Sequence, residues 1–100
     1  MKLPVVVWPE AEADLLTARD WYDQQRQGLG DSFAAAAEEL IARIKASPEL
    51  YPAASHGVRF GKLRRFPYVA YFRVLEDRIE VLAVLHGRRD PRVWQERSST

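Results

Sequence analysis

The 100-residue chain contains no cysteine, which excludes disulfide bonds, cysteine nucleophiles and thiolate zinc sites. It has only two histidines, His56 and His86, which leaves little for a metal site. No apolar run approaches the roughly 20 residues that a membrane-spanning helix needs. The stretch from Met1 to Trp8 is too short and too weakly basic for a signal peptide. These absences predict a cytoplasmic protein that uses no metal and no cofactor.

Motifs of the common enzyme classes are also missing. There is no glycine-rich nucleotide fingerprint, no P-loop and no G-x-S-x-G elbow. Carboxylates are paired at Glu10/Asp14 and at Glu38/Glu39, but we expect both pairs on exposed, solvated helix faces. His86 follows an apolar run and could act as a general base, although a hydrogen-bonded structural histidine is the more common role.

What the sequence does contain is typical of one folded domain. The hydrophobic share of 47% and the charged share of 29% are those of a globular protein. A chain of this length buries roughly two-thirds of its unfolded surface, which is enough for a two-layer core. We expect a single domain over residues 1–97, with residues 98–100 frayed.

The first half of the chain predicts one strand and two helices. Residues 2–8 contain three consecutive valines, which favour a short strand, and Pro9 suits the first position of a helix. An apolar stripe at helical spacing continues to about residue 27. Asp31 or Ser32 can cap a second helix, which Ser47-Pro48 ends. The two helices form an αα-hairpin.

The second half changes to a period of two. Strands are predicted over 58–66, 68–75 and 79–85, with a tight turn at 76–78 and a short helix after Pro91. Three consecutive strands of this kind form an antiparallel meander. The fold class is therefore α+β, a two-layer domain in the order β-α-α-β-β-β. The position and direction of the first strand in the sheet stay open.

Charge is distributed unevenly along the chain. The formal net charge is only +1, yet residues 58–75 contain five basic residues and no acidic one. Arginine dominates, and its planar fork suits phosphates and carboxylates and stacks on aromatic rings. One interpretation is a docking surface; the other is a solvated face that balances an acidic first half.

The strand pattern helps to locate these cations. In a strand over 58–66, Lys62 and Arg64 share one face, and Arg59 and Arg65 share the other. Both faces cannot be core, so we expect a basic surface close to the arginines of the tail. Aromatic residues interleave with these cations, which could bind single-stranded nucleic acid by stacking. For most of them, core packing is the simpler interpretation.

Two stretches then resemble a known family. Residues 62–74 (KLRRFPYVAYFRV) and 79–94 (IEVLAVLHGRRDPRVW) are similar to the RelE/ParE toxin superfamily. Residues 7–15 (VWPEAEADL) and the Trp21-Tyr22 pair resemble its ParE branch. The resemblance spans nearly the whole chain and implies the RelE/ParE-like fold. It also implies the toxin of a bacterial type II toxin–antitoxin module, of the plasmid stabilisation kind.

The two branches of the superfamily differ in activity. ParE-like members inhibit DNA gyrase by binding, whereas RelE-like members cut mRNA on the ribosome. The resemblance also implies a cognate, ParD-like antitoxin. A disordered acidic segment that folds over a basic, partly apolar surface would suit this charge distribution. Sequence-specific DNA binding would belong to the antitoxin and not to this chain.

Individual positions favour the ParE-like branch. RelE-like enzymes have an arginine where this chain has Val69 and Ala70, and their C-terminal tyrosine corresponds to Trp94. An indole N–H cannot exchange protons near neutral pH. Lys62, Arg64 and Arg89 do match basic positions of the nucleases, and His86 would be their only acid–base candidate.

We therefore expect a gyrase-binding inhibitor with no catalytic residues of its own. The alternatives are a ribosome-dependent endoribonuclease and a non-toxic member that only binds its antitoxin. The residues predicted to face the target are Arg64, Arg65, Arg88, Arg89 and Trp94. Trp94 has a structural alternative, a plug that closes the sheet edge. Arg73 is expected to form an ion pair with Glu80 across the hairpin.

Overall fold

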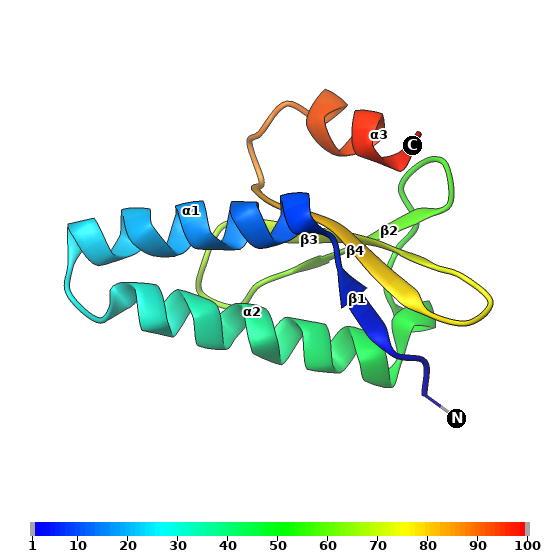
Figure 1. Cartoon of the computed structure of the whole chain (residues 1–100), viewed down its shortest axis with the longest axis horizontal. Helices are drawn as coiled ribbons and strands as arrows, with labels where there is room; N and C mark the ends of the chain where they lie inside the picture. Colours follow the sequence, from blue (N-terminus) through cyan, green and yellow to red (C-terminus); the bar gives the residue numbers. More distant parts are fainter. Residues whose placement is uncertain (1, 100) are drawn as a thin grey trace.

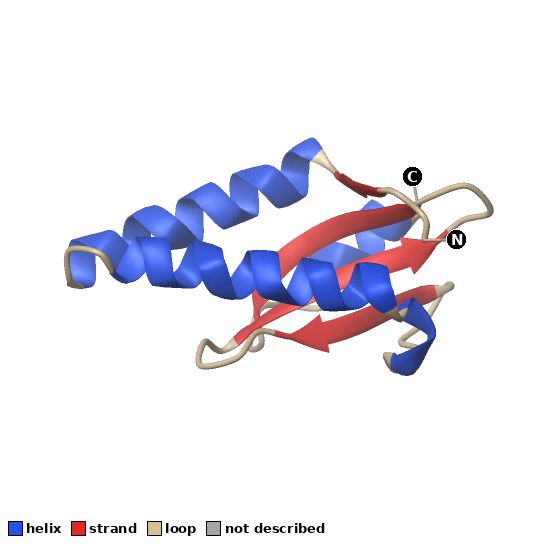
Figure 2. Cartoon of the chain, turned by 90° about the horizontal axis from the view of Figure 1, so that it is seen from below, coloured by secondary structure: helices blue, strands red, loops and turns tan. Residues whose placement is uncertain are grey.

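The computed structural model describes residues 2–99 and confirms the predicted α+β fold, in which the helical hairpin packs on one face of the sheet; the short C-terminal helix covers part of the other face, which the two-layer prediction did not include (Figures 1 and 2). Its elements, in chain order, are β1 (Val5–Val7), α1 (Pro9–Gln25), α2 (Leu29–Ala46), the short 3-10 helix η1 (Pro48–Leu50), β2 (Val58–Lys62), β3 (Tyr68–Val74), β4 (Ile79–His86) and α3 (Arg92–Ser98). The predicted αα-hairpin and the short helix after Pro91 are both present. Among residues 2–99, no helix has the length and apolar character needed to cross a membrane.

The four strands form one sheet in the order β1-β4-β3-β2. The antiparallel meander of β2, β3 and β4 is confirmed. The structure also places the first strand, which the sequence left open: β1 pairs with β4 in parallel, with Val5 opposite Ile79. Prolines flank β1 at Pro4 and Pro9, so this edge strand stays short, as edge strands that avoid further pairing commonly do.

Two predicted boundaries were wrong. The second helix begins at Leu29, before the predicted caps, because Asp23 of α1 accepts a hydrogen bond from the Gly30 amide at 2.7 Å. A side chain at Gly30 would lie only 2.6 Å from the Arg19 carbonyl oxygen, so the close approach of the two helices requires glycine. The second strand ends at Lys62 and not at residue 66. Arg64 and Arg65 therefore lie in the loop after β2, and the prediction that they lie on opposite faces of a strand was wrong.

The apolar core lies on both faces of the sheet. The α1–α2 hairpin covers one face and buries Phe33, Leu40 and Ile44 against β3 and β4. The short α3 packs on a second cluster that contains Leu82, Leu85 and Trp94. Because both of its faces are covered, β4 is buried from Ile79 to Leu85.

A bulge in β4 lies next to a polar contact between β4 and α1. Tyr71 of β3 pairs with Ala83 and Phe72 pairs with Val81, so Leu82 has no partner in β3. Asp14 of α1 accepts a hydrogen bond from the Val84 amide at 3.0 Å. Our expectation that Asp14 lies on a solvated face was wrong, since only 12% of its side chain is exposed.

The chain end was expected to fray from residue 98. Ser98 is the last residue of α3, and its hydroxyl donates a hydrogen bond to the Gln95 carbonyl at 2.8 Å. Ser99 follows the helix, and its amide donates to the Glu96 carbonyl at 3.4 Å. Thr100, like Met1, lies outside the described residues.

Candidate functional site

Two loops meet at one end of the sheet and hold most of the predicted site. The first, residues 63–67, connects β2 to β3, and the second, residues 87–91, connects β4 to α3. The Gly87 amide donates a hydrogen bond to the Pro67 carbonyl at 2.8 Å, which joins the loops. Since β2 ends, β3 begins and β4 ends here, antiparallel pairing brings the loops together. We call this region the basic end; its cations are Lys62, Arg64, Arg65, Arg88 and Arg89.

Four cations of the basic end have no carboxylate partner. Within residues 2–99, no ion pair involves Lys62, Arg65, Arg88 or Arg89. All four side chains are exposed. The structure therefore leaves Arg65 exposed in the first loop, Arg88 and Arg89 exposed in the second, and Lys62 exposed at the end of β2.

Arg64 is the exception at the basic end. Its guanidinium lies 3.0 Å from the Glu39 carboxylate of α2, and 68% of its side chain is exposed. An exposed pair of this kind contributes at most about 1 kcal/mol. Arg64 can therefore exchange Glu39 for another anion at low cost, but its positive charge is partly balanced in the free protein.

Arg65 has an unusual backbone. Its φ is +68°, in the left-handed region that suits glycine and asparagine and is disfavoured for other residues. The side chain is exposed, so no core packing explains the choice of arginine. A strained residue with a free charge at a loop tip is typical of a position selected for function.

Trp94 is not presented to solvent with these cations. Its ring stacks on Tyr71 with centroids 5.0 Å apart and planes at 12°, and only 6% of the residue is exposed. It covers the outer face of the sheet and does not close an edge. Its ring borders a hollow of about 370 Å³, and Lys62 and Phe60 line the other side. Burial raises the pKa of the Tyr71 hydroxyl beneath it.

His86 has a structural role in the second loop. Its Nδ1 accepts a hydrogen bond from the Arg88 amide at 3.0 Å, and its carbonyl accepts one from the Arg89 amide at 2.8 Å. A neutral imidazole in this arrangement carries its proton on Nε2. The alternative of a hydrogen-bonded histidine is thus confirmed, and the ring fixes the backbone that presents Arg88 and Arg89.

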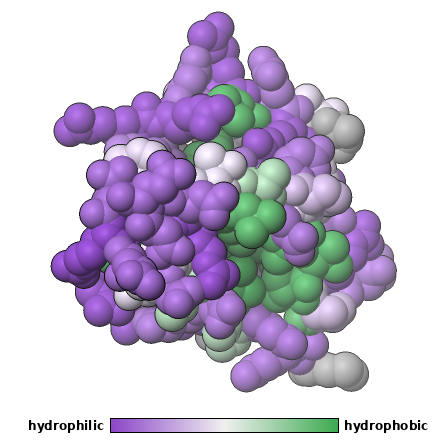
Figure 3. Space-filling model, turned by 60° about the vertical axis from the view of Figure 1, so that its left-hand side comes forward, coloured by the Kyte–Doolittle hydropathy of each residue, from purple (hydrophilic) through white to green (hydrophobic). Residues whose placement is uncertain are grey.

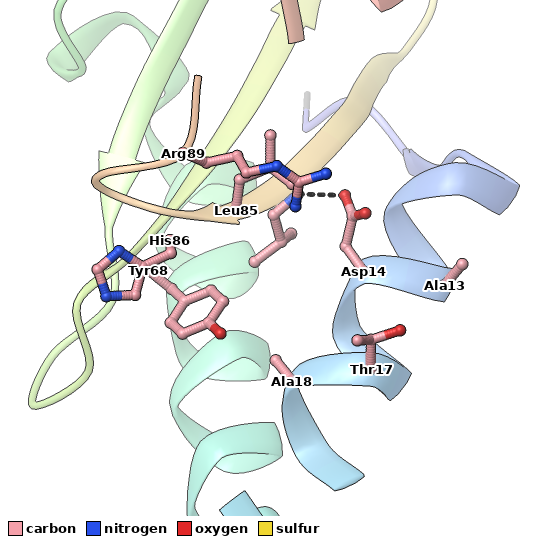
Figure 4. Close-up of a pocket in the computed structure, with 9 residues that line it drawn as sticks. Ala13, Asp14, Thr17, Ala18, Tyr68, Leu85, His86 and Arg89 are labelled. Atoms are coloured by element: carbon pink, nitrogen blue, oxygen red, sulfur yellow. Dashed lines mark hydrogen bonds between the residues drawn. The ribbon is translucent and has the colours of Figure 1, made fainter. Parts of the chain in front are cut away.

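A hollow of about 270 Å³ opens between α1 and the end of β4 (Figure 4). Arg89 and Tyr68 line one side of it, and Asp14 and Thr17 of α1 line the other. Burial raises the pKa of the Tyr68 hydroxyl, and the charge of Arg89 offsets part of that shift. Since Asp14 is already engaged by Val84 and Arg97, Arg89 is the open charge of this hollow.

Other arginines are fully engaged and belong to the scaffold. Arg97 of α3 binds the Asp14 carboxylate through two nitrogens, at 2.6 and 3.1 Å, and donates to the Leu82 carbonyl at 3.1 Å. Arg73 donates to Glu80 at 2.9 Å, which confirms the predicted ion pair. It also donates to the Ser98 carbonyl at 3.4 Å and lies over the Trp8 ring.

No metal centre is evident in the part of the chain that the structure describes. Among residues 2–99, no three histidine, aspartate or glutamate side chains gather in a group that could hold an ion. The exposed arginines of the basic end can bind anions through their planar guanidinium forks.

The sequence did not single out Trp21 as a site residue. Its ring is 53% exposed and lies beside Tyr68 and His86. Trp21 sits next to the apolar helical stripe, and that position alone does not distinguish a core tryptophan from an exposed one. Only the packing of Tyr22 into the core shows that its neighbour must face outward.

Comparison with known proteins agrees with this arrangement. The family described as ParE toxin of type II toxin-antitoxin system, parDE, matches residues 5–91. A solved structure titled "Chromosomal ParDE TA system from P. aeruginosa" shares the fold, with a TM-score of 0.65 and 23% identity over 85% of this chain and 96% of that one. No curated protein matches the sequence. Because the family match spans most of the chain, this protein belongs to the ParE toxin family of type II toxin–antitoxin systems.

Proposed function

We propose that this toxin inhibits DNA gyrase by binding to it, and that a cognate antitoxin neutralises the toxin. The observation that carries the proposal is the basic end, where four cations form no ion pair with a carboxylate of the described residues 2–99. A surface of unpaired charge on a rigid pair of loops favours association with a large anionic partner. Membership of the ParE toxin family supports gyrase as that partner.

Two positions, Trp94 and His86, support binding rather than RNA cleavage. Cleavage needs a positioned base and acid in addition to cations. Trp94 is stacked on Tyr71 and its indole cannot exchange protons near neutral pH. His86 uses Nδ1 to accept the Arg88 amide, so that nitrogen is not available as a base.

A different surface suits the antitoxin. A shallow groove of about 180 Å³ runs between α1 and α2, with Leu16 exposed at 61% along its wall. Figure 3 shows a band of apolar residues among hydrophilic ones, in a view that brings forward the end of the molecule where α1 and α2 are joined. The groove is lined by Leu15, Leu16, Arg19, Phe33, Ala34, Ala37, Glu38 and Ile41. Small alanines allow close approach, so an amphipathic helix of the antitoxin fits here better than on the basic end.

A supercoiling assay tests the gyrase proposal. Excess purified toxin should abolish supercoiling by gyrase and accumulate cleaved DNA. The double variant Arg88→Gln, Arg89→Gln should need about a hundredfold more protein, because it loses two charged contacts of about 1.5 kcal/mol each. Lys45→Gln, which removes an exposed charge from the last turn of α2, is the matched control. Normal supercoiling at excess wild-type toxin would contradict the proposal.

Co-purification with the product of the neighbouring gene tests the antitoxin surface. Leu16→Asp should abolish the stable complex and leave gyrase inhibition intact, because Leu16 lies on the hairpin and not at the basic end. Leu50→Asp is the matched control, since Leu50 is 78% exposed outside the groove. Equal complex formation by both variants would place the antitoxin elsewhere on the toxin.

A further inference from the structure

An aromatic hollow adjoins the basic end. It measures about 440 Å³ and is lined by Thr17, Ala18, Trp21, Tyr22, Pro67, Tyr68 and His86. Tyr68 and His86 also line the hollow that contains Arg89 and a third hollow of about 260 Å³ that contains Lys62 and Arg88. Three hollows thus meet around one tyrosine–histidine pair, whose ring centroids are 5.5 Å apart. Lys62, Arg88 and Arg89 thus line hollows that share these two rings with the hollow beside Trp21, and Arg65 lies in the adjoining loop.

Trp21 is exposed and packs against one neighbouring ring. Its ring meets Tyr22 edge to face at 5.0 Å, and Tyr22 in turn stacks on the buried Phe33 at 5.4 Å. The small side chains of Thr17 and Ala18 leave the space beside Trp21 open. A large exposed ring that already packs against another ring offers stacking area at low entropic cost.

The carboxylates close to this surface, Asp14 and Asp90, are each paired with an arginine outside it. No carboxylate lines the hollow beside Trp21 or the hollow with Lys62 and Arg88. Asp14 borders the hollow with Arg89, but Arg97 neutralises its charge through two hydrogen bonds. An anion that reaches Lys62, Arg88 and Arg89 therefore meets no opposing free acid in these hollows.

Arg65 adds an independent observation. Its left-handed backbone would be relaxed by glycine or asparagine, yet the position carries an exposed, unpaired arginine. The strained position at the loop tip is thus occupied by a positively charged residue and not by glycine.

We infer that this surface binds single-stranded DNA, with phosphates on Lys62, Arg65, Arg88 and Arg89 and one unstacked base beside Trp21. Rings that stack bases next to cations that follow the backbone are the shared features of single-strand binding. An acidic peptide would use the cations but not the aromatic hollow, and a duplex keeps its bases out of reach. The choice of DNA over RNA rests on the proposed action on gyrase.

Fluorescence anisotropy with the full-length toxin and a labelled 12-nucleotide oligothymidine tests the inference. With four phosphate contacts, the plot of log K against log salt concentration should have a slope of about −3. Arg65→Gln should reduce the magnitude of that slope by about 0.7, because one contact is lost and the backbone strain is retained. Lys45→Gln should bind as the wild type does.

The base contact has its own signature. Trp21→Ala should weaken binding about tenfold at every salt concentration without changing the slope, because stacking releases no counterions. Trp21→Phe keeps a ring and should retain most of the affinity. Loss of slope rather than affinity in Trp21→Ala would overturn the assignment of Trp21.

Competing ligands complete the test. Duplex DNA of the same length should bind at least about tenfold more weakly than the single strand. Equal binding of oligouridine, or binding of polyglutamate without binding of oligothymidine, would overturn the inference. If gyrase is inhibited but oligothymidine does not bind, only this inference fails. If oligothymidine binds but gyrase is not inhibited, the inference holds and the proposed function fails.

Discussion

The molecule uses arginine in two opposite ways. Arg73, Arg78 and Arg97 each reach a carboxylate within 3 Å or less and lie partly buried along the sheet and α3. Arg65, Arg88 and Arg89 lie exposed in two loops, and none of them forms an ion pair within residues 2–99. The first set binds the fold together, and the second set leaves its hydrogen-bonding capacity open for a partner.

The number of charges alone does not show which arginines form ion pairs within the fold. From the sequence, an arginine-rich second half is compatible with a docking surface and with a solvated face that balances an acidic first half. In this protein Arg73, Arg78 and Arg97 stabilise the fold through ion pairs, and the docking surface is our proposal for other, exposed arginines. The discriminating property is the presence of an acidic partner from another element, such as Asp14 for Arg97 or Glu80 for Arg73.

The largest effect should come from breaking the pair that holds α3. Arg97→Ala leaves the Asp14 carboxylate partly buried without its cation and should lower the free energy of unfolding by about 3 kcal/mol. Urea denaturation measures this. Arg92→Ala in the same helix is the control, because its pair with Asp90 is exposed and should be worth less than about 1 kcal/mol.

A double-mutant cycle sharpens the result. If Asp14 and Arg97 act as a pair, the Asp14→Ala, Arg97→Ala variant should lose clearly less than the two single losses together. If the two single losses in the free energy of unfolding simply add, Arg97 does not stabilise the fold through its pair with Asp14. The same conclusion follows if Arg97→Ala loses no more stability than Arg92→Ala.

This pair also marks the limit of sequence reasoning. Arg73 and Glu80 could be paired in advance because a tight turn fixes which residues of a hairpin face each other, and the register confirms it. Asp14 and Arg97 are 83 residues apart, and their contact depends on α3 folding back over a bulged strand. No local periodicity contains that information.

The candidate site, like the ion pairs, was predictable from the sequence only in part. Cations close together in sequence, such as Arg88 and Arg89, were found because a loop keeps neighbours together. Trp94 was chosen for its place in the motif, but its stacking on Tyr71 depends on how the outer face is covered. Trp21 was missed because exposure of one ring beside an apolar stripe is decided by tertiary packing.

An intermediate effect is expected from Glu80, the shared partner of Arg73 and Arg78. Burial alone would raise the pKa of this carboxyl, but hydrogen bonds from both arginines and their charges outweigh burial and lower it. A lowered pKa in the folded state stabilises the protein above the ordinary value of 4.5. That contribution is lost as the pH falls through the folded pKa.

Glu80→Gln should therefore cost about 1.5 kcal/mol at pH 7 and much less at pH 3. Thermal unfolding of both proteins across this range measures the difference, which should shrink steadily as the pH falls. Glu76→Gln in the neighbouring turn is the control, because its side chain is exposed and it forms no ion pair with a described residue. A difference that stays constant with pH would contradict the role of the charge.

The smallest effect should have the opposite sign and tests the second set of arginines. Arg65→Gly relieves the steric cost of the left-handed backbone, which is about 1 kcal/mol for a non-glycine residue. The greater conformational entropy of glycine in the unfolded chain offsets part of this gain. We expect a net gain of about 0.5 kcal/mol in the free energy of unfolding, together with weaker gyrase inhibition. Arg88→Gly, on a backbone without positive φ, should gain nothing in stability. A loss of stability in Arg65→Gly would assign Arg65 to the scaffold and end the distinction at that residue.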